Sequence, residues 1–362
     1  MSAIISDRTA FAQVCAELGA HQAVGLDTEF MRERTYFAQL CLVQLSFGER
    51  ALCIDSLALP DLTALAPIMA APNVCKVLHA ARQDLEVLAP AVGAGLQGVF
   101  DTQVAAALIG MPAQVGYADL VAQLLGAHLH KAETRTDWSR RPLTAGQLAY
   151  ALDDVRYLLP LRQRLSERLE SLGRSAWLAE EMAQLDAAAG SLAVDPDEAW
   201  RRIKGISDLD PARRSLARAL AAWRERRAIE ADRPRSWIVS DIALRDLVLR
   251  VPRSRNELAR TAELPDGVLN HSGEQILSVI EAAGLPASLP PLPRRQRPEA
   301  AETERLRQLS LLTQQTGREL GIAPEILATR RDLQRLLNGE REGGPLSGWR
   351  RGVIGERLLQ AL

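Results

Sequence analysis

Four acidic residues and a tyrosine could together form a metal-dependent hydrolytic site. Asp27 and Glu29 lie two residues apart in an apolar segment typical of a strand, so both side chains should point to one face. At about 4 Å, two such charges repel by roughly 4 kcal/mol, which favours a cation between them. Tyr150 and Asp154 lie four residues apart on one face of an expected helix, and Asp84 stands near the start of another. Oxygen ligands of this kind suit Mg²⁺ or Mn²⁺ better than Zn²⁺.

Each of these features also has an ordinary structural explanation. A DxE pair occurs in many loops that bind nothing, and Asp84 could simply favour a helix N-terminus through the helix dipole. Tyr150 and Asp154 could be a surface pair. The prediction of a metal site therefore depends on the fold bringing the five residues together.

The segments that carry the acids predict strands followed by helices. The apolar run Ala23–Phe30 and the two runs after it, QLCLVQLSF and ALCID, predict three strands joined as hairpins. A helical stretch over residues 61–70 then leads to a strand at residues 74–79, a helix through ARQDLEVLAP and a strand at residues 99–102. Strands that alternate with helices indicate parallel pairing, so we expect a mixed sheet covered by helices.

The rest of the chain is predicted to be helical. From Thr144 onward, apolar residues recur at three- and four-residue spacing through LTAGQLAYALDDVRYLLPLRQRLSERL, and a further helix is expected over residues 175–188. Small residues and a proline near residues 187–200 mark a domain boundary. We therefore expect an α/β mixed-sheet domain over residues 1–190, followed by two all-α helical-bundle domains at residues 197–284 and 299–362.

Two details describe these helical blocks. Five prolines between Pro286 and Pro298 favour an extended, semi-rigid spacer between them. The tripeptide Arg-Asp-Leu occurs once in each block, at residues 245–247 and 331–333, which hints at a diverged duplication.

The composition is that of a globular protein with an uneven charge distribution. Among 362 residues, 47% are hydrophobic and 25% charged, which excludes a disordered or fibrous chain. No apolar run is long enough to span a bilayer and the start lacks the pattern of a signal peptide, so we expect a cytoplasmic protein. Residues 1–190 hold 15 Lys+Arg and 21 Asp+Glu; subtraction from the totals of 44 and 45 leaves 29 and 24 for the remainder. The acidic first part suits metal binding and the basic second part suits a polyanion. The four cysteines lack CxxC spacing and are expected to be reduced.

The ordered set of acids and tyrosine resembles the DEDD superfamily of 3′ to 5′ exonucleases, in its tyrosine branch. More closely, the chain resembles the ribonuclease D family along nearly its whole length, in the segments GLDTEFMRERTYFAQLCLVQLS, VLHAARQDLEVL, VFDTQ, KAETRTDWSRRPLTAGQLAYALDDVRYLLPL and LSGWRRGVIGERL. Ala38 stands where the family's TYxPQL pattern has a proline. The resemblance implies a ribonuclease H-like nuclease domain and two helicase-and-ribonuclease-D C-terminal (HRDC) domains, the second divergent.

The resemblance also implies a mechanism. Two divalent ions, Mg²⁺ or Mn²⁺, would hydrolyse the terminal phosphodiester of RNA and release nucleoside 5′-monophosphates, above all from tRNA precursors. Asp27 would bridge both ions, and Glu29 with Asp154 would complete the site for the attacking water. Asp84 would support the second ion. Tyr150 would orient the water instead of acting as a strong base, because an unperturbed tyrosine pKa is about 10.

Several basic residues are candidates for RNA contact. Phosphate contacts by such cations give affinity that is independent of sequence, and 15 aromatic residues are too few for broad base stacking. For the loop before the last acidic motif, a solvated loop is an equally open interpretation. The RNA-binding candidates are Lys131, Arg135, Arg140 and Arg141 in that loop, and Arg201 and Arg202 at the start of the first helical block, where Lys204, Arg213, Arg214, Arg224, Arg226 and Arg227 follow.

Two other functions stay open. A two-metal site recognises the phosphate and not the sugar, so a 3′ to 5′ exonuclease acting on DNA is possible on sequence alone. A non-catalytic RNA-binding scaffold could retain the fold, although all five site residues are intact. A monomer is expected from the family resemblance.

Overall fold

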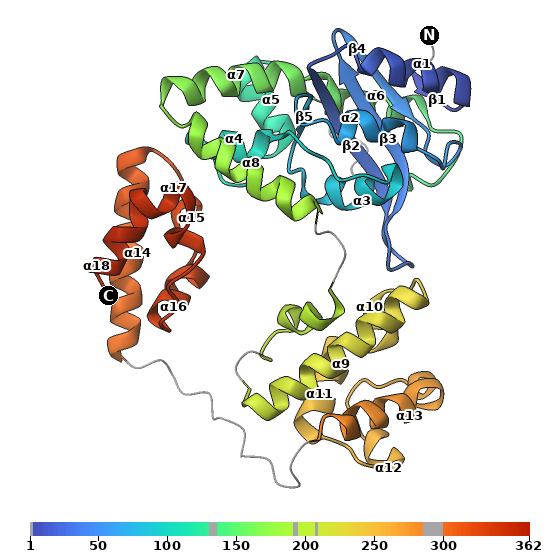
Figure 1. Ribbon diagram of the computed structural model, residues 1–362, viewed down its shortest axis with the longest axis vertical. Coiled ribbons are helices and arrows are strands. Elements are labelled where there is room, and N and C mark those ends of the chain that lie inside the picture. The colour runs from blue at the N-terminus through green and yellow to red at the C-terminus, as the bar shows by residue number, and fades with distance from the viewer. Residues whose placement is uncertain (1–2, 130–135, 191–194, 207–208, 285–299) are drawn as a thin grey trace. The chain divides into compact units, whose positions relative to one another are not determined.

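The computed structural model in Figure 1 describes residues 3–129, 136–190, 195–206, 209–284 and 300–362. They fall into two compact units. The first, called here the sheet unit, comprises Met1–Met31, Leu40–Leu192 and Pro298–Leu362. The second, the helical unit, comprises Arg32–Gln39 and Ala193–Arg297.

A mixed six-stranded sheet forms the centre of the sheet unit, in the order β1-β4-β3-β2-β5-β6. β3 runs antiparallel to β4, whereas β1 with β4, β2 with β5, and β5 with β6 are parallel. The expected strands are all present; β1, two residues long, has too short a pattern to be recognised in the sequence. The strands are β1 Ile4–Ile5, β2 Ala23–Met31, β3 Gln39–Phe47, β4 Arg50–Ile54, β5 Cys75–Leu78 and β6 Val99–Asp101.

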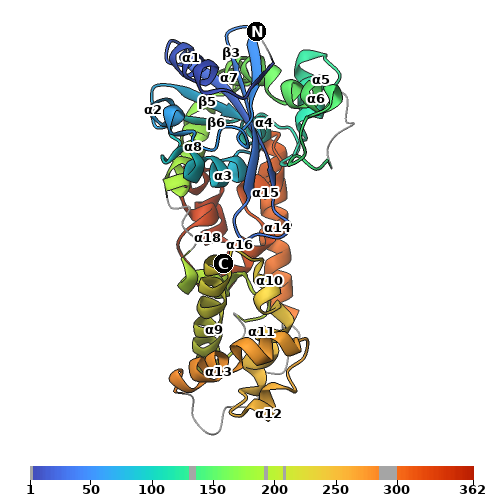
Figure 2. The same ribbon diagram turned by 90° about the vertical axis from the view of Figure 1, so that its right-hand side faces the viewer.

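Helices cover both faces of this sheet, with α1 and α2 on one side of the strands and α6 on the other (Figure 2). α1 and α3 bury Phe11 and Leu85 in one cluster with Val24 and Leu26 of β2. α7 packs on the opposite face, where a Cβ on Gly25 would lie 3.2 Å from Leu158 Cβ and 2.2 Å from Ser46 Oγ. The helices before the boundary are α1 Arg8–Leu18, η1 Thr63–Leu65, α2 Ala66–Met69, α3 Arg82–Val92, α4 Thr102–Leu108, α5 Tyr117–Leu125, α6 Ala145–Arg156, α7 Leu158–Ser171 and α8 Ser175–Gly190.

The long apolar pattern after Thr144 forms two helices instead of one continuous helix. α6 begins with a capping box between Thr144 and Gln147 and ends at Arg156, and α7 starts at Leu158. Pro160 explains the break: it has no N–H for the preceding turn, and its ring would clash with the carbonyl of Arg156 in a continuous helix.

The helices of residues 300–362, which the sequence sets apart as a third domain, share a hydrophobic cluster with α4, α5, α7 and α8. Trp177 of α8 stacks on Trp349, with ring centroids 4.3 Å apart and planes 9° apart. Glu181 accepts a hydrogen bond from Trp349 Nε1 at 2.8 Å and forms an ion pair with Arg350 at 2.5 Å. These elements are α14 Ala300–Leu320, α15 Pro324–Leu327, α16 Arg330–Leu337, η3 Gly344–Leu346, α17 Gly348–Arg350, η4 Arg351–Gly355 and α18 Glu356–Gln360.

The helical unit has its own core, formed by its helices around Leu216, Leu247 and Ile276. It also includes the loop Arg32–Gln39, in which Tyr36 donates a hydrogen bond to the buried Glu225 at 2.5 Å. Its helices are η2 Pro196–Arg202, α9 Pro211–Glu230, α10 Arg235–Ile238, α11 Asp241–Arg250, α12 Arg255–Leu258 and α13 Asp266–Ala282.

The two helical blocks share an order of elements. A long helix (α9 or α14) is followed by a four-residue helix (α10 or α15) and then by the helix that carries Arg-Asp-Leu (α11 or α16). Ser240 caps α11 and Thr329 caps α16, each through its side chain. This agreement strengthens the duplication hypothesis. The proline-rich spacer between the blocks lies outside the described residues.

The structure also describes the cysteines and the length and polarity of the helices. All four cysteines are free thiols, as expected. Within the described ranges, no helix combines the length and the apolar character that crossing a bilayer would require.

Candidate active site

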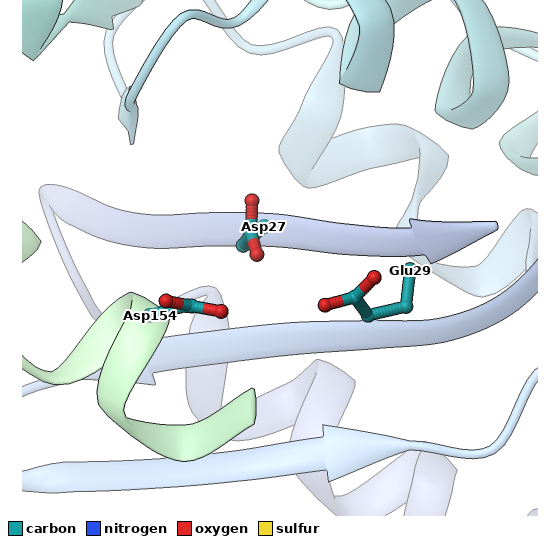
Figure 3. Close-up of side chains that lie close together, drawn as sticks. All are labelled: Asp27, Glu29 and Asp154. Atoms are coloured by element: carbon teal, nitrogen blue, oxygen red, sulfur yellow. The ribbon is translucent and has the colours of Figure 1, made fainter. Parts of the chain in front are cut away.

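Strand β2 and helix α6 bring three of the four predicted acids together. Val24 and Leu26 face α1 and α3, so the alternation of the strand turns Asp27 and Glu29 to the opposite face, where α6 packs. Asp154 reaches the same place from α6 (Figure 3). One carboxylate oxygen from each of Asp27, Glu29 and Asp154 lies within 4.8 Å of the others. These three acids could hold a metal ion.

Tyr150 lies one helical turn before Asp154 and donates a hydrogen bond to its carboxylate. Its ring also lies 6.1 Å, centroid to centroid, from the buried ring of Trp138. Burial, with smaller contributions from the nearby acids, raises the pKa of Tyr150, so the hydroxyl keeps its proton at neutral pH. The sequence gives no signal that Trp138 supports this tyrosine.

Asp84 stands apart from the three-acid cluster and arrives from the other face of the sheet. It is the third residue of α3 and is 7% exposed. Its Oδ1 accepts a hydrogen bond of 2.5 Å from Thr28 Oγ1. Thr28 lies between Asp27 and Glu29 and therefore points to the face that α3 covers. Thr28 is not among the predicted site residues, because nothing in a DxE pattern shows that its middle residue has a partner.

Burial raises the pKa values of all four acids, and repulsion from the other acids of the site adds to it for Asp27 and Glu29. Burial is the largest cause in each case: it raises the pKa of Glu29 to about 8, of Asp154 to about 7 and of Asp84 to about 6. Asp27 has a pKa well above its usual range, from burial and then from its three acidic neighbours. Among the residues that the structure describes, no lysine or arginine forms a salt bridge with any of the four. An all-oxygen donor set with excess negative charge fits a hard divalent cation.

Asp101, the last residue of β6, has a structural role. Its carboxylate caps α4 by accepting from the backbone N–H groups of Gln103 and Val104. It also accepts from the N–H groups of Ala80 and Ala81, which lead into α3. Asp101 therefore fixes the turn that delivers Asp84.

Arg141, one of the predicted RNA contacts, is tied inside the protein. Its Nε and Nη2 donate to the two oxygens of Asp55, both at 2.7 Å. The remaining N–H groups donate to the carbonyls of Trp138, Arg140 and Cys41. All five N–H donors of Arg141 are therefore occupied within the protein, and RNA contact by this residue stays a prediction. Its bonds anchor the segment that leads into α6.

The other predicted RNA contacts differ in their surroundings. Lys131 and Arg135 lie outside the described residues. The Arg140 side chain is 84% exposed, 3.3 Å from Asp137. Arg201 and Arg202 are exposed at the end of η2, where Arg201 forms an ion pair with Glu198.

Two arginines counted toward the basic surface are buried instead. Arg213 and Arg224 are 6% and 3% exposed, and they pair with Asp210 and Asp241, each at 2.7 Å. The sequence could not distinguish these internal ion pairs from surface cations.

Comparison with known proteins identifies the family of this chain. A family model described as 3′-5′ exonuclease matches residues 2–170, and one described as HRDC domain matches residues 213–280. Ribonuclease D of Granulibacter bethesdensis is 39% identical, with 98% of this chain and 91% of that protein covered. The chain belongs to the ribonuclease D family. Ribonuclease D of Pseudomonas paraeruginosa is 38% identical, over 99% of this chain and 96% of its own.

A solved structure of the family agrees along the whole chain. The crystal structure of Escherichia coli RNase D, described as an exoribonuclease involved in structured RNA processing, superposes with a TM-score of 0.87 at 33% identity, covering 99% of this chain and 98% of that one. The expected family, the mixed-sheet nuclease domain and the helical C-terminal region with an HRDC domain are confirmed. The chain is therefore a 3′-5′ exonuclease, a hydrolase of a family that depends on divalent metal ions.

Proposed function

We propose that this protein removes nucleoside 5′-monophosphates one at a time from the 3′ end of RNA, and that it acts in tRNA 3′ maturation. The observation that carries the proposal is the convergence of Asp27, Glu29 and Asp154 within 4.8 Å, with Tyr150 bonded to Asp154. The names of the family's members, ribonuclease D and exoribonuclease, support RNA as the substrate.

The four acids would hold two divalent ions, Mg²⁺ or Mn²⁺. When bound, such a pair activates a water on one side of the phosphorus and stabilises the leaving oxygen on the other. Asp27 would ligate both ions, and Glu29 with Asp154 would complete the site for the attacking water, as the family resemblance implies; the convergence of these three acids supports this assignment. Asp84, from the opposite face, would support the second ion.

Tyr150 would position the attacking water. Its hydroxyl stays protonated at neutral pH and is bonded to Asp154, so it can orient a neighbouring oxygen but cannot take its proton. The proton would leave to the carboxylates or to solvent.

The RNA backbone would be held by exposed cations. Arg140, Arg201 and Arg202 remain candidates for phosphate contact, because their side chains reach solvent. Lys131 and Arg135 stay predictions without a structural account. A monomeric state and a cytoplasmic location likewise stay predictions.

A metal-dependence experiment tests the proposed reaction. Hydrolysis of a 3′-labelled RNA should stop in EDTA and return with Mg²⁺ or Mn²⁺. Asp27→Asn should lose activity by about a thousandfold while staying folded. Mononucleotide release by Asp27→Asn at the parent's rate would refute the assigned site.

A substrate comparison tests the two alternatives. Matched RNA and DNA oligonucleotides should show faster trimming of RNA, and the reverse order would favour the DNA exonuclease. If no divalent ion supports release of mononucleotides, the RNA-binding scaffold becomes the better interpretation.

A further inference from the structure

The end of strand β2 leaves an opening on the side of β5. β2 pairs with β5 from Ala23 opposite Cys75 to Gly25 opposite Val77, and β5 ends at Leu78. Thr28 therefore lies beyond the end of its neighbouring strand. Backbone groups at such a place have no ladder partner and must find another.

The carboxylate of Asp84 is the partner of Thr28 beyond the end of β5. Its Oδ1 accepts from the hydroxyl of Thr28 at 2.5 Å, and its carboxylate also receives the backbone N–H of Thr28. The bond joins side chains that are 56 residues apart and is buried. A buried hydrogen bond to a charged acceptor is among the stronger ones in proteins, so it fixes the direction of the carboxylate.

The bond also connects the two faces of the sheet. Asp27, Glu29 and Asp154 meet on the face that α6 covers, whereas α3 brings Asp84 from the other face. Thr28 is covalently joined to both Asp27 and Glu29. A displacement of Asp84 relative to those two acids would therefore have to break the bond to Thr28.

We propose that Thr28 is a positioning residue of the active site, whose hydroxyl holds Asp84 at a fixed place relative to the acids of β2. This inference rests on the proposed metal-dependent function. Without the hydroxyl, Asp84 keeps its charge but loses the contact that sets the direction of its second oxygen. Groups that orient a metal ligand typically change affinity or activity about 10- to 100-fold when removed.

The substitution Thr28→Val tests the hydroxyl alone, because valine keeps the shape and the strand preference of threonine. The matched control is Thr28→Ser, which keeps the hydroxyl and removes a methyl group. We expect Thr28→Val to lower kcat by about 10-fold or more and to weaken Mn²⁺ binding in calorimetry by a similar factor. The KM for RNA should stay within about twofold, and Thr28→Ser should stay near the parent in both measurements.

A double-mutant cycle separates positioning from a general structural defect. If Thr28 acts through Asp84, adding Thr28→Val to Asp84→Asn should change kcat and Mn²⁺ affinity little further. Unaltered kcat and Mn²⁺ affinity in Thr28→Val would overturn the proposal, as would equal damage in Thr28→Ser. Fully additive effects in the cycle would also overturn it. Failure of the proposed function itself would look different, since the parent protein would then bind no Mn²⁺ and release no mononucleotides.

Discussion

Replacing Asp154 by asparagine should stabilise the metal-free protein at alkaline pH, although it removes a proposed metal ligand. Burial, with a smaller contribution from Asp153, raises the pKa of Asp154 from 3.8 to about 7. An acid whose folded pKa exceeds its unfolded value contributes its full stability below the unfolded pKa and loses it as the pH rises toward the folded pKa. The parent should therefore lose stability over the window from 3.8 to about 7, and the variant should not.

The size of the effect follows from the same shift. Each pKa unit is worth about 1.4 kcal/mol, so the rise from 3.8 to about 7 sets a ceiling of about 4 kcal/mol. Asp154 is only partly buried, and it titrates together with Glu29, so both solvent screening and coupling reduce that figure. We expect about half the ceiling, or about 2 kcal/mol, since asparagine is isosteric and can still accept the bond from Tyr150.

Thermal melting in EDTA measures this difference. At about pH 8, Asp154→Asn should raise the Tm of the sheet unit by about 4 °C or more, and at about pH 4 by less than about 1 °C. A divalent ion should raise the Tm of the parent more than that of the variant. The matched control is Asp153→Asn on the same helix, whose carboxylate pairs with Arg156 at 2.5 Å and should give no gain. Equal melting of parent and Asp154→Asn at about pH 8, or a gain of the same size at both pH values, would refute the reasoning.

Three further predictions concern side chains around the site. Tyr150→Phe should lower kcat by about 10-fold or more with RNA affinity nearly unchanged; a defect confined to binding would contradict the water-orienting role. Arg141→Lys should cost about 3 kcal/mol in urea denaturation, because lysine cannot replace the paired bonds to Asp55; unchanged stability would exclude an anchoring role. Trp349→Ala should cost about 3 kcal/mol and speed hydrogen exchange in α14 and α18, whereas parent-like exchange there would show that stacking on Trp177 does not hold these helices.

Local patterns predicted most of the elements that carry the site. The alternation in β2 placed Asp27 and Glu29 on one face, and the four-residue spacing placed Tyr150 beside Asp154. Each of these placements depends on one strand or one helix alone. It can therefore be predicted from residues that are close together in the chain.

The rest depends on partners that are distant in sequence. Thr28 meets Asp84 across 56 positions, and Arg141 meets Asp55 across 86. In the sequence, an arginine that binds RNA cannot be distinguished from an arginine that pairs with an internal carboxylate. The sequence therefore could not show that Arg141 pairs with Asp55, since only the folded chain shows which acid an arginine reaches.

Two aspartates of the sheet unit differ in the charges that surround them. Burial tends to raise the pKa of Asp55, but hydrogen bonds and charge from Arg141 outweigh it, and its pKa lies below the usual value. Asp154 is also partly buried, and burial raises its pKa, with a smaller contribution from Asp153; the hydrogen bond from Tyr150 lowers the pKa too little to offset burial. Among the described residues, an arginine thus pairs with Asp55, which holds the segment before α6, whereas no lysine or arginine forms a salt bridge with the acid cluster. A cation that binds this cluster in the folded protein should therefore add to stability as well as take part in hydrolysis.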